Sequence, residues 1–323
     1  MGDVVQALPV ACALRRARPG ARITWAVEGW LAPLVAGHTA IDRVVAFPRL
    51  AGGRLSASWP RELRRAVAEL RREPYDVALD LQGLLKSSLV ALLSGAARRL
   101  GVPPQREGSR LVSTAVARDG AGHAVQRYLA GARALGAAGE EVRFEVPIRA
   151  DAAARVQQVL ANLPLDPGRP LVALAPSSSR RAKDWPAARW QELVARLHES
   201  ANLLLIGAGE HRQRHRPLAE ASGGRVHDFT GATSLAELAA LLARCDLFIA
   251  ADSGPLHLAA ALGRPVLGLY GPTDPQRHGP YGQPHAALAH RALCAPGCGP
   301  RRCLRQSACL HAISVEEVLE KIR

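Results

Sequence analysis

Apolar and polar positions follow one another along this chain in two kinds of run. Short aliphatic runs bounded by turn residues predict buried parallel strands, and longer runs with helical spacing of the apolar positions predict helices. In the second half, strands are expected at 171–175, 202–206, 246–250 and 265–270, and helices at 186–199, 234–243 and 255–262. Because strand and helix alternate, the pattern favours an α/β fold with a parallel sheet covered by helices on both faces.

The first half repeats this pattern, with a helix expected at 4–18, a strand at 22–27, a helix at 61–73 and a strand at 75–81. A doubly wound domain normally begins with a strand. Here the first element is the helix at 4–18, so we expect the N-terminal domain to lack its first strand.

The length of 323 residues is too great for one ordinary core and fits two domains of about 150 residues each. We predict two Rossmann-like domains, residues 1–150 and 151–323, with parallel sheets that face a central cleft. The boundary is expected where a strand at 142–147 gives way to a connecting helix at 151–162. The last helix, 314–323, is a candidate to pack back on the N-terminal domain.

Composition places the chain among soluble globular proteins, with 48% hydrophobic and 22% charged residues. No stretch reaches the ~18 uninterrupted apolar residues that would span a bilayer. Asp3 stands where a secretory signal would carry positive charge, and Arg15 and Arg16 follow the apolar stretch instead of preceding it. We therefore expect a cytoplasmic protein.

The formal charge of +14 indicates a negatively charged partner, because clustered arginines attract phosphates and acidic lipids. Proteins that bind single-stranded nucleic acid or RNA usually interleave aromatic residues with the basic ones. This chain has four Phe and four Tyr, and none alternates with the arginine clusters. We therefore expect an anionic membrane surface or glycolipid as partner, and no nucleic acid.

Six cysteines in a reducing compartment do not indicate a disulfide framework. Cys12 and Cys245 lie in apolar helical patterns and are expected to be buried. The other four are crowded near the end of the chain, at Cys294, Cys298, Cys303 and Cys309. Their spacing does not match the paired C-x2-C of a structural zinc site, so no metal is expected, although the sequence leaves a metal at these cysteines open.

The loop after the expected strand 171–175 has the composition of a diphosphate site. It reads A-P-S-S-S-R-R-A-K-D-W-P and supplies hydroxyls, backbone amides and a lysine before a helix begins. The candidates are Ser177, Ser178, Ser179 and Lys183. Lys183 is one of three lysines in a chain that otherwise uses arginine, which indicates a role for a compact point charge. The alternative is an ordinary polar loop.

A second candidate element is A-A-D-S-G-P-L-H-L-A-A-A-L, residues 250–262, where a strand end meets a helix start. Open α/β sheets bind ligands at such places. The candidates are Asp252, Ser253, Gly254 and His257. Asp252 and Ser253 have the alternative role of capping the helix, and His257 that of a buried structural histidine.

A third strand end, L-I-G-A-G-E, brings Glu210 toward the same edge of the sheet. A carboxylate there suits a ribose hydroxyl. The stretch lacks G-x-G-x-x-G, so it gives no support for a nicotinamide or flavin dinucleotide.

Polar residues also stand at helix and strand ends in the first half. Asp3 follows Gly2 at the start of the first helix, and D-L-Q-G-L-L-K-S-S places Asp80, Gln82 and Lys86 at a strand end. We expect these groups to face the same cleft as those of the second half. For Asp3 the alternative is a helix cap, which the helix dipole favours equally.

Taken in order, M-G-D-V-V-Q-A-L-P, D-L-Q-G-L-L-K-S-S, K-D-W-P, G-A-G-E, D-S-G-P-L-H-L-A-A-A-L-G-R-P-V and L-Y-G-P-T-D-P resemble the motifs of glycosyltransferase family 9. The resemblance covers nearly the whole chain. The D-L-Q-G-L-x-K-S motif is most similar to that of the first heptosyltransferase of core assembly.

The resemblance implies a GT-B fold and an inverting transfer of heptose from ADP-heptose to the Kdo-lipid A inner core of lipopolysaccharide, on the inner face of the inner membrane. It assigns the acceptor to the N-terminal domain, with Asp80, Gln82 and Lys86. Asp3 would be the base that accepts the proton of the acceptor hydroxyl. Basic residues around 54–72 and 98–110 would meet the phosphates of lipid A.

The same resemblance assigns the ADP-sugar to the C-terminal domain, without metal or cofactor. Lys183 would offset the charge on the departing ADP. The diphosphate would be held by Ser177, Ser178 and Ser179 with Lys183, the adenosine ribose by Glu210, and the sugar and phosphates by Asp252, Ser253, Gly254 and His257.

Two other functions stay open on the sequence. One is another nucleotide-sugar transferase or an epimerase on the same fold, because fold does not fix function. The other is a basic membrane-associated binding protein that has lost catalysis. Donor binding separates the first from a heptosyltransferase, and lipid affinity without turnover would favour the second.

Overall fold

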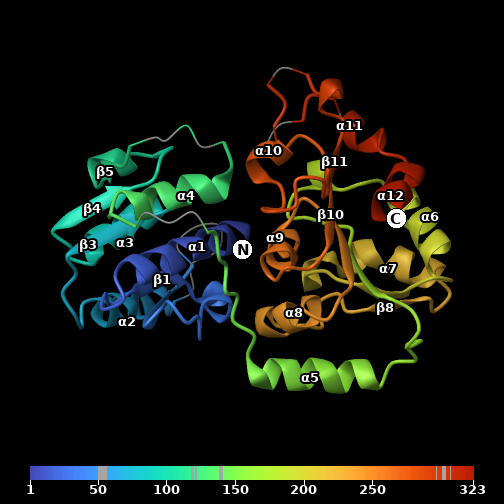
Figure 1. Ribbon diagram of the computed structural model, residues 1–323, viewed down its shortest axis with the longest axis horizontal. Helices are drawn as coiled ribbons and strands as arrows, with labels where there is room; N and C mark the ends of the chain where they lie inside the picture. The colour runs from blue at the N-terminus through green and yellow to red at the C-terminus, as the bar shows by residue number, and fades with distance from the viewer. Residues whose placement is uncertain are drawn as a thin grey trace. The chain divides into compact units, whose positions relative to one another are not determined.

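The computed structural model describes residues 1–49, 57–117, 120, 122–137, 141–295, 297–299, 303–305 and 307–323 (Figure 1). The chain forms two compact units, and the division between them falls between Pro147 and Ile148. Each unit combines parallel strands with helices. In the described part of the chain, no helix has the length and apolar character needed to cross a membrane.

The second unit is built on a six-stranded sheet with the order β11-β10-β9-β6-β7-β8, and every neighbouring pair is parallel. The strands are β6 (Leu171–Ala175), β7 (Asn202–Leu205), β8 (Val226–Asp228), β9 (Leu247–Ala251), β10 (Val266–Tyr270) and β11 (Ala287–Ala289). The chain proceeds outward from β6 in one direction and then restarts at β9 on its other side. This order is that of a Rossmann sheet, whose ligands bind where the carboxyl ends of β6 and β9 diverge.

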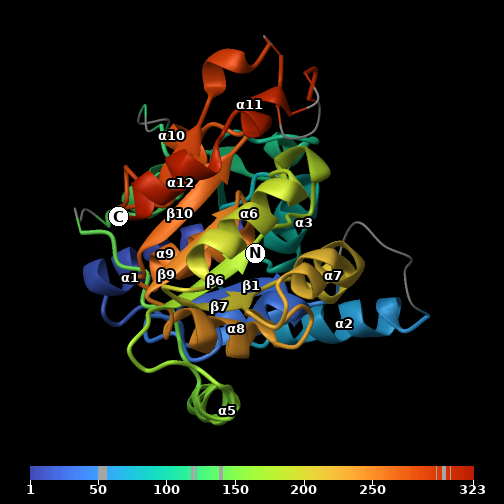
Figure 2. The ribbon, with the colours of Figure 1, turned by 90° about the vertical axis from the view of Figure 1, so that its right-hand side faces the viewer.

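Helices cover both faces of this sheet (Figure 2). The long ones are α5 (Ala150–Ala161), α6 (Ala187–Leu197), α7 (Arg212–Ala221), α8 (Leu235–Leu242), α9 (Gly254–Ala261) and α12 (Val315–Ile322), and short ones are η3 (Arg181–Lys183), η4 (Gly209–His211), α10 (Pro275–His278), η5 (Arg291–Leu293) and α11 (Ala308–His311). Helix α6 contacts α7 and α12, whereas α8 contacts α5 and α9. The buried residues of α6, among them Trp190, Leu193 and Leu197, recur at helical spacing and fill the core against the sheet.

The last helix belongs to the core of the second unit. Val315 and Val318 of α12 are fully buried in the cluster that also holds Trp190 and Leu203. The packing of this helix against the N-terminal domain stays a prediction. Its apolar face matches α6, which lies beside it.

The first unit carries its parallel strands in two separate sheets. One pairs β1 (Thr24–Glu28) with β2 (Arg43–Phe47), and the other has the order β3-β4-β5 (Val77–Asp80, Arg98–Gly101, Thr114–Ala115). No strand ladder joins β1 to β3 in the described residues. The first element of this unit is helix α1, and its described strands form two separate ladders.

Helices of the first unit are α1 (Gly2–Ala17), α2 (Trp59–Leu70), α3 (Leu85–Leu93) and α4 (Ala124–Arg133), with short turns η1 (Gly29–Leu34) and η2 (Ser109–Leu111). The middle of α1 is buried continuously from Val5 to Ala13, as expected for a central helix of an α/β domain. Helix α2 buries Ala66 and Leu70 against Val45 and Phe47 of β2.

The expected strand at 142–147 is wrong. Residues 141–149 form no regular element, although they carry the alternating pattern of a strand. Glu145 has a backbone φ of 48°, in the left-handed region that interrupts an extended run. The carbonyl oxygen of Phe144 faces Nε2 of His38 at 3.0 Å instead of a neighbouring strand.

Candidate functional site

Two loops of the second unit meet at the point where its sheet divides. Lys183 follows β6, Asp252 follows β9, and Nζ of Lys183 lies 2.6 Å from Oδ2 of Asp252. The side chain of Asp252 is only 5% exposed and that of Lys183 18% exposed. A buried carboxylate requires a compensating partner, and the lysine supplies it while keeping part of its surface open. The structure thus brings together two of the residues that the sequence nominated separately.

The start of α9 adds further polar groups to this pair. Ser253 is the N-cap residue, yet its hydroxyl makes no cap hydrogen bond, and Oγ is buried without a hydrogen-bond partner in the described structure. Nε2 of His257, one turn into the helix, lies 3.9 Å from Oδ1 of Asp252. The first amides of α9, at Gly254 and beyond, therefore have no side-chain cap, which is the arrangement that binds anions at a helix N-terminus.

Side-chain interactions of Asp184 stabilise the loop after β6. Oδ1 of Asp184 accepts hydrogen bonds from the backbone N–H and the hydroxyl of Ser178, at 2.8 and 3.3 Å. Oδ2 of Asp184 pairs with Nη1 of Arg214 at 2.6 Å. Burial raises the pKa of Asp184, while the hydrogen bond from the Ser178 amide and the charge of Arg214 oppose that rise. Arg214 comes from α7 and was not among the candidates nominated from the sequence. Ser178 stabilises the loop itself.

The remaining candidates of the second unit occupy more open positions. Ser177 is half-buried and Ser179 is exposed in the same loop. Glu210 lies on η4 after β7, with its side chain 75% exposed and Oε1 at 3.6 Å from Nε2 of His211. Trp185, in the K-D-W-P motif, is a core residue whose Nε1 donates to the carbonyl of Ile313.

In the first unit, Asp3 stands exposed in the first turn of α1. Its Oδ1 accepts a hydrogen bond of 3.2 Å from the hydroxyl of Tyr128, which comes from α4. Burial raises the pKa of Tyr128 far above its usual value, and the charge of Asp3 adds to the rise. Tyr128 therefore stays a neutral donor that orients the carboxylate. No local pattern points to this partner, because it is 125 positions away along the chain.

The turn after β3 places the other candidates of the first unit. Oδ1 of Asp80 accepts the N–H groups of Gln82 and Gly83 at 3.0 Å, and Oδ2 accepts the hydroxyl of Ser88 at 2.6 Å. Asp80 is buried and shapes the turn, whereas Gln82 is exposed. Nζ of Lys86 pairs with Oε1 of Glu28, at the end of β1, at 2.9 Å.

Charged groups from three elements therefore influence one another in this unit. Burial lowers the pKa of the Met1 amine, the charges of Asp3 and Glu28 raise it, and that of Lys86 lowers it. Glu28 was not nominated by the sequence, because a lone carboxylate at a strand end gives no pattern. The arrangement offers both signs of charge to a polar ligand.

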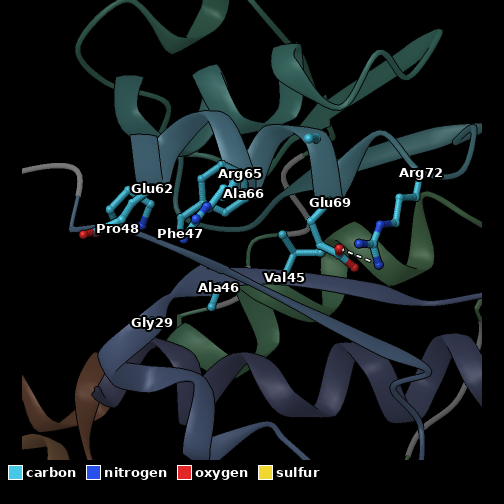
Figure 3. Close-up of a pocket in the computed structure, with 11 residues that line it drawn as sticks. Gly29, Val45, Ala46, Phe47, Pro48, Glu62, Arg65, Ala66, Glu69 and Arg72 are labelled. Atoms are coloured by element: carbon cyan, nitrogen blue, oxygen red, sulfur yellow. Dashed lines mark ion pairs between the residues drawn. The ribbon is translucent and has the colours of Figure 1, made fainter. Parts of the chain in front are cut away.

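A pocket of about 710 Å³ opens elsewhere on the first unit, between β2 and α2 (Figure 3). Its lining includes Val45, Phe47 and Ala66, with Arg65 and Arg72 along the rim. Arg72 pairs with Glu69, and none of the individually named donor, acceptor or catalytic candidates lines the pocket. Arg65 and Arg72 belong to the basic range 54–72, of which residues 54–56 lie outside the described structure.

Two groups of side chains in this protein are of types that can bind metal ions. Cys12, His38 and Glu145 have ligand atoms within 4.8 Å of one another. Both nitrogens of His38 are already engaged, Nδ1 by the N–H of Ala40 and Nε2 by the carbonyl of Phe144, and burial raises the pKa of Cys12 to about 12. A neutral thiol and an engaged imidazole do not suit a metal. The other group is the four tail cysteines, all of them free thiols.

Comparison with known proteins bears on these sites. The family model for glycosyltransferase family 9 (heptosyltransferase) matches residues 63–303. Lipopolysaccharide heptosyltransferase 1 of Escherichia coli K12 is 31% identical over 285 residues, covering 88% of each chain. Lipopolysaccharide heptosyltransferase 1 of Pseudomonas aeruginosa PAO1 is 32% identical over 312 residues, covering 95% of this chain and 85% of its own.

Solved structures agree with these matches. An E. coli heptosyltransferase solved with ADP is 28% identical, with a TM-score of 0.76 over 100% of this chain and 96% of its own. A family 9 glycosyltransferase from Veillonella parvula shares the fold with a TM-score of 0.81 and 23% identity. The predicted GT-B fold, with parallel Rossmann-like sheets, is confirmed. The chain belongs to glycosyltransferase family 9, the heptosyltransferase family.

Proposed function

We propose that this protein transfers heptose from ADP-heptose to the Kdo-lipid A inner core of lipopolysaccharide, with inversion at the anomeric carbon. The observation that carries the proposal is the Lys183–Asp252 pair at the dividing point of the second sheet, in a family 9 chain. The relatives of this chain include lipopolysaccharide heptosyltransferases and a heptosyltransferase solved with ADP.

The donor is assigned to the second unit. The open amides of α9 and the unpaired hydroxyl of Ser253 suit the diphosphate, and Lys183 offsets the negative charge that grows on the departing ADP. Ser177 and Ser179 extend the donor loop, while Ser178 keeps its shape. Glu210 is exposed after β7, as a carboxylate that accepts ribose hydroxyls must be. Asp252 holds Lys183, and His257 faces the same carboxylate.

The acceptor is assigned to the first unit. Asp3 accepts the proton of the acceptor hydroxyl as its oxygen attacks the anomeric carbon, and the bond from that carbon to ADP breaks with its electron pair left on the phosphate. Tyr128 orients Asp3. Gln82 and Lys86 contact the acceptor, and Asp80 supports the turn that carries them.

The reaction proposed here uses no metal and no cofactor. A point charge on Lys183 supplies the stabilisation of the leaving diphosphate that a divalent cation gives in other transferases. The protein is assigned to the cytoplasmic face of the inner membrane, where a lipid acceptor is presented, and its formal charge of +14 suits an anionic surface.

The test is titration calorimetry of the protein with ADP, UDP and ADP-heptose in the presence of a chelator. We expect ADP and ADP-heptose to bind and UDP to bind much more weakly. Incubation with ADP-heptose and Kdo-lipid A should then add one heptose to the acceptor, as seen by mass spectrometry. Preference for UDP would point to another nucleotide-sugar enzyme, and binding of ADP-heptose without transfer would contradict the catalytic assignment.

A further inference from the structure

Helix α3 of the first unit exposes a continuous apolar stripe. Leu85, Leu89 and Leu92 recur at spacings of four and three residues, which places them on one face of the helix. They are 41%, 43% and 44% exposed. Large aliphatic side chains normally turn inward when a helix lies on a sheet, so three on the outer face of one short helix form a patch rather than scattered exposure.

The turn η2 lies beside α3 and exposes a further leucine. Helix α3 contacts η2, whose last residue, Leu111, is 92% exposed, more than any other large hydrophobic side chain among the described residues. Such a leucine contributes nothing to the core of its own unit. We call Leu85, Leu89, Leu92 and Leu111 together the leucine face.

Arginines stand at both ends of the leucine face. Arg71 donates through Nε to the carbonyl of Leu93 at 2.7 Å, which fixes it at the C-terminal end of α3. Arg106, bonded through its backbone to Gly83 at the other end, and Arg110, beside Leu111, are exposed and have no ion pair in the described structure. The turn also contains Glu107, so its net charge stays positive.

We propose that the leucine face docks on a bilayer of anionic lipid, with the four leucines inserted at the level of the headgroups and Arg71, Arg106 and Arg110 on the lipid phosphates. Apolar side chains rimmed by arginine are the composition of proteins that lie in a membrane interface. The charges favour this occupant over a second copy of the chain, because two such faces would bring like-charged arginines together.

This inference rests on the proposed function in one respect. The stripe begins three residues after Gln82 and shares α3 with Lys86, and both of these residues are assigned to the acceptor. An acceptor whose acyl chains stay in the bilayer must be met by a transferase at the bilayer surface. The leucine face would therefore set the acceptor-binding turn at the depth of the lipid headgroups.

The test is flotation with vesicles of phosphatidylcholine alone and with about a third phosphatidylglycerol, at low and high salt. Wild-type protein should float with the anionic vesicles. The variant Leu89→Ser/Leu92→Ser/Leu111→Ser should lose about tenfold or more of its partition coefficient, because three apolar side chains no longer leave water. Arg106→Gln/Arg110→Gln should lose the dependence on anionic lipid and on salt.

The matched control is Leu293→Ser/Leu304→Ser, which removes two leucines of similar exposure, 41% and 46%, from the second unit. It should float as wild type does, and all variants should keep wild-type ADP affinity. Equal flotation of the leucine variant and the wild type would overturn the proposal. So would a change from dimer to monomer in light scattering with no change in flotation, since the face would then join two copies.

A kinetic readout separates this proposal from the proposed function. With acceptor in vesicles, the leucine variant should show a raised KM at unchanged kcat, and with a deacylated, water-soluble acceptor it should match the wild type. If the wild type transfers no heptose to either acceptor, the proposed function is contradicted. The flotation experiment still tests whether the leucine face binds anionic vesicles. If KM is unchanged with vesicles, docking has no part in acceptor delivery and the proposal fails.

Discussion

Some polar residues of the second unit stabilise a loop, whereas others remain accessible to a ligand. Asp184 accepts hydrogen bonds from Ser178 and forms an ion pair with Arg214. These interactions stabilise the conformation of the loop. Lys183 pairs with Asp252, and its side chain keeps 18% of its surface exposed. An ammonium has three donors, so Lys183 can bind a phosphate oxygen without releasing Asp252.

Replacing Lys183 with Ala should therefore affect donor and reaction together. We expect weaker ADP-heptose binding and a fall in kcat/KM of about 10²-fold or more, because a positioned charge at the leaving group is lost. Steady-state kinetics and calorimetry measure both quantities. The control is Arg181→Ala, an exposed basic residue two positions earlier in the same turn. Wild-type kinetics in the Lys183 variant would remove its role in catalysis.

Asp3 should respond differently, since it acts on the acceptor. Asp3→Asn keeps the size of the side chain and removes the base, so turnover should fall about 10²-fold or more while ADP affinity stays within about twofold. Asp76→Asn, at another exposed carboxylate of the same unit, is the matched control. Tyr128→Phe should lower turnover less, because the hydroxyl only orients Asp3. Full turnover by the Asp3 variant would exclude it as the base.

At the scale of elements, the end of the chain is a helix with a complete capping box. The hydroxyl of Ser314 accepts the N–H of Glu317 at 3.1 Å, and Oε2 of Glu317 accepts the N–H of Ser314 at 2.8 Å. Burial of Val315 and Val318 follows directly on this cap. The cap therefore fixes the angle at which α12 enters the core of the second unit.

Ser314→Ala should destabilise the second unit by about 1 kcal/mol, the usual cost of losing a capping hydroxyl. Urea unfolding followed by tryptophan fluorescence suits the measurement, because Trp185 and Trp190 lie in the same core as α12. Ser314→Asp keeps an acceptor at the cap and should remain close to wild type. A loss of equal size in both variants would mean that the cap contributes little.

Elements with a clear burial pattern were predictable from the sequence. Many candidate site residues were nominated because they directly follow such a predicted strand. The strand at 171–175 has the predicted limits because it is aliphatic throughout and bounded by Pro170 and Pro176. The run at 142–147 has an equally regular pattern, but the left-handed Glu145 and the contact between Phe144 and His38 override it. Such tertiary contacts leave no local signal.

The site shows the same limit. Lys183 and Asp252 could be nominated because parallel strands bring their carboxyl ends to one edge of a sheet. Tyr128, Glu28 and Arg214 could not, because each is defined by a partner distant in sequence. The sequence nominated Asp80 for a ligand, whereas the structure shows both of its oxygens engaged in the turn. Its acceptor role stays a prediction.

For the molecule as a whole, the dependence of stability on pH has an identifiable source in the second unit. His215 is buried, its Nδ1 lies 2.9 Å from the hydroxyl of Thr230, and its Nε2 has no hydrogen-bond partner in the described structure. Burial lowers the pKa of His215 to about 4, with the neighbouring His211 adding to the shift. Gly207 makes room for the ring, because a Cβ there would lie 2.5 Å from Cε1 of His215.

The pKa of His215 is about 4 in the folded protein and near 6.5 in the unfolded chain. Between pH 4 and pH 6.5 the unfolded state therefore binds more protons than the folded state. The contribution of His215 is therefore complete above about pH 6.5 and is lost as the pH falls toward 4, amounting to about 3 kcal/mol. Urea unfolding of the wild type and of His215→Gln from pH 7.5 to 4.5 measures it. The variant should show a shallower loss, and parallel curves would contradict the assignment.

The division of the first sheet affects how that unit resists opening. In the second unit, each interior strand is bonded on both sides, so removing one requires breaking two ladders. Among the described residues of the first unit, β1 is bonded to β2 alone, and β3 to β4 alone. The two pieces are connected by side-chain packing and by contacts such as the Lys86–Glu28 ion pair. Backbone amides of β1 and β3 should consequently exchange with solvent sooner than those of β6 and β9, and the first unit should lose its cooperativity before the second.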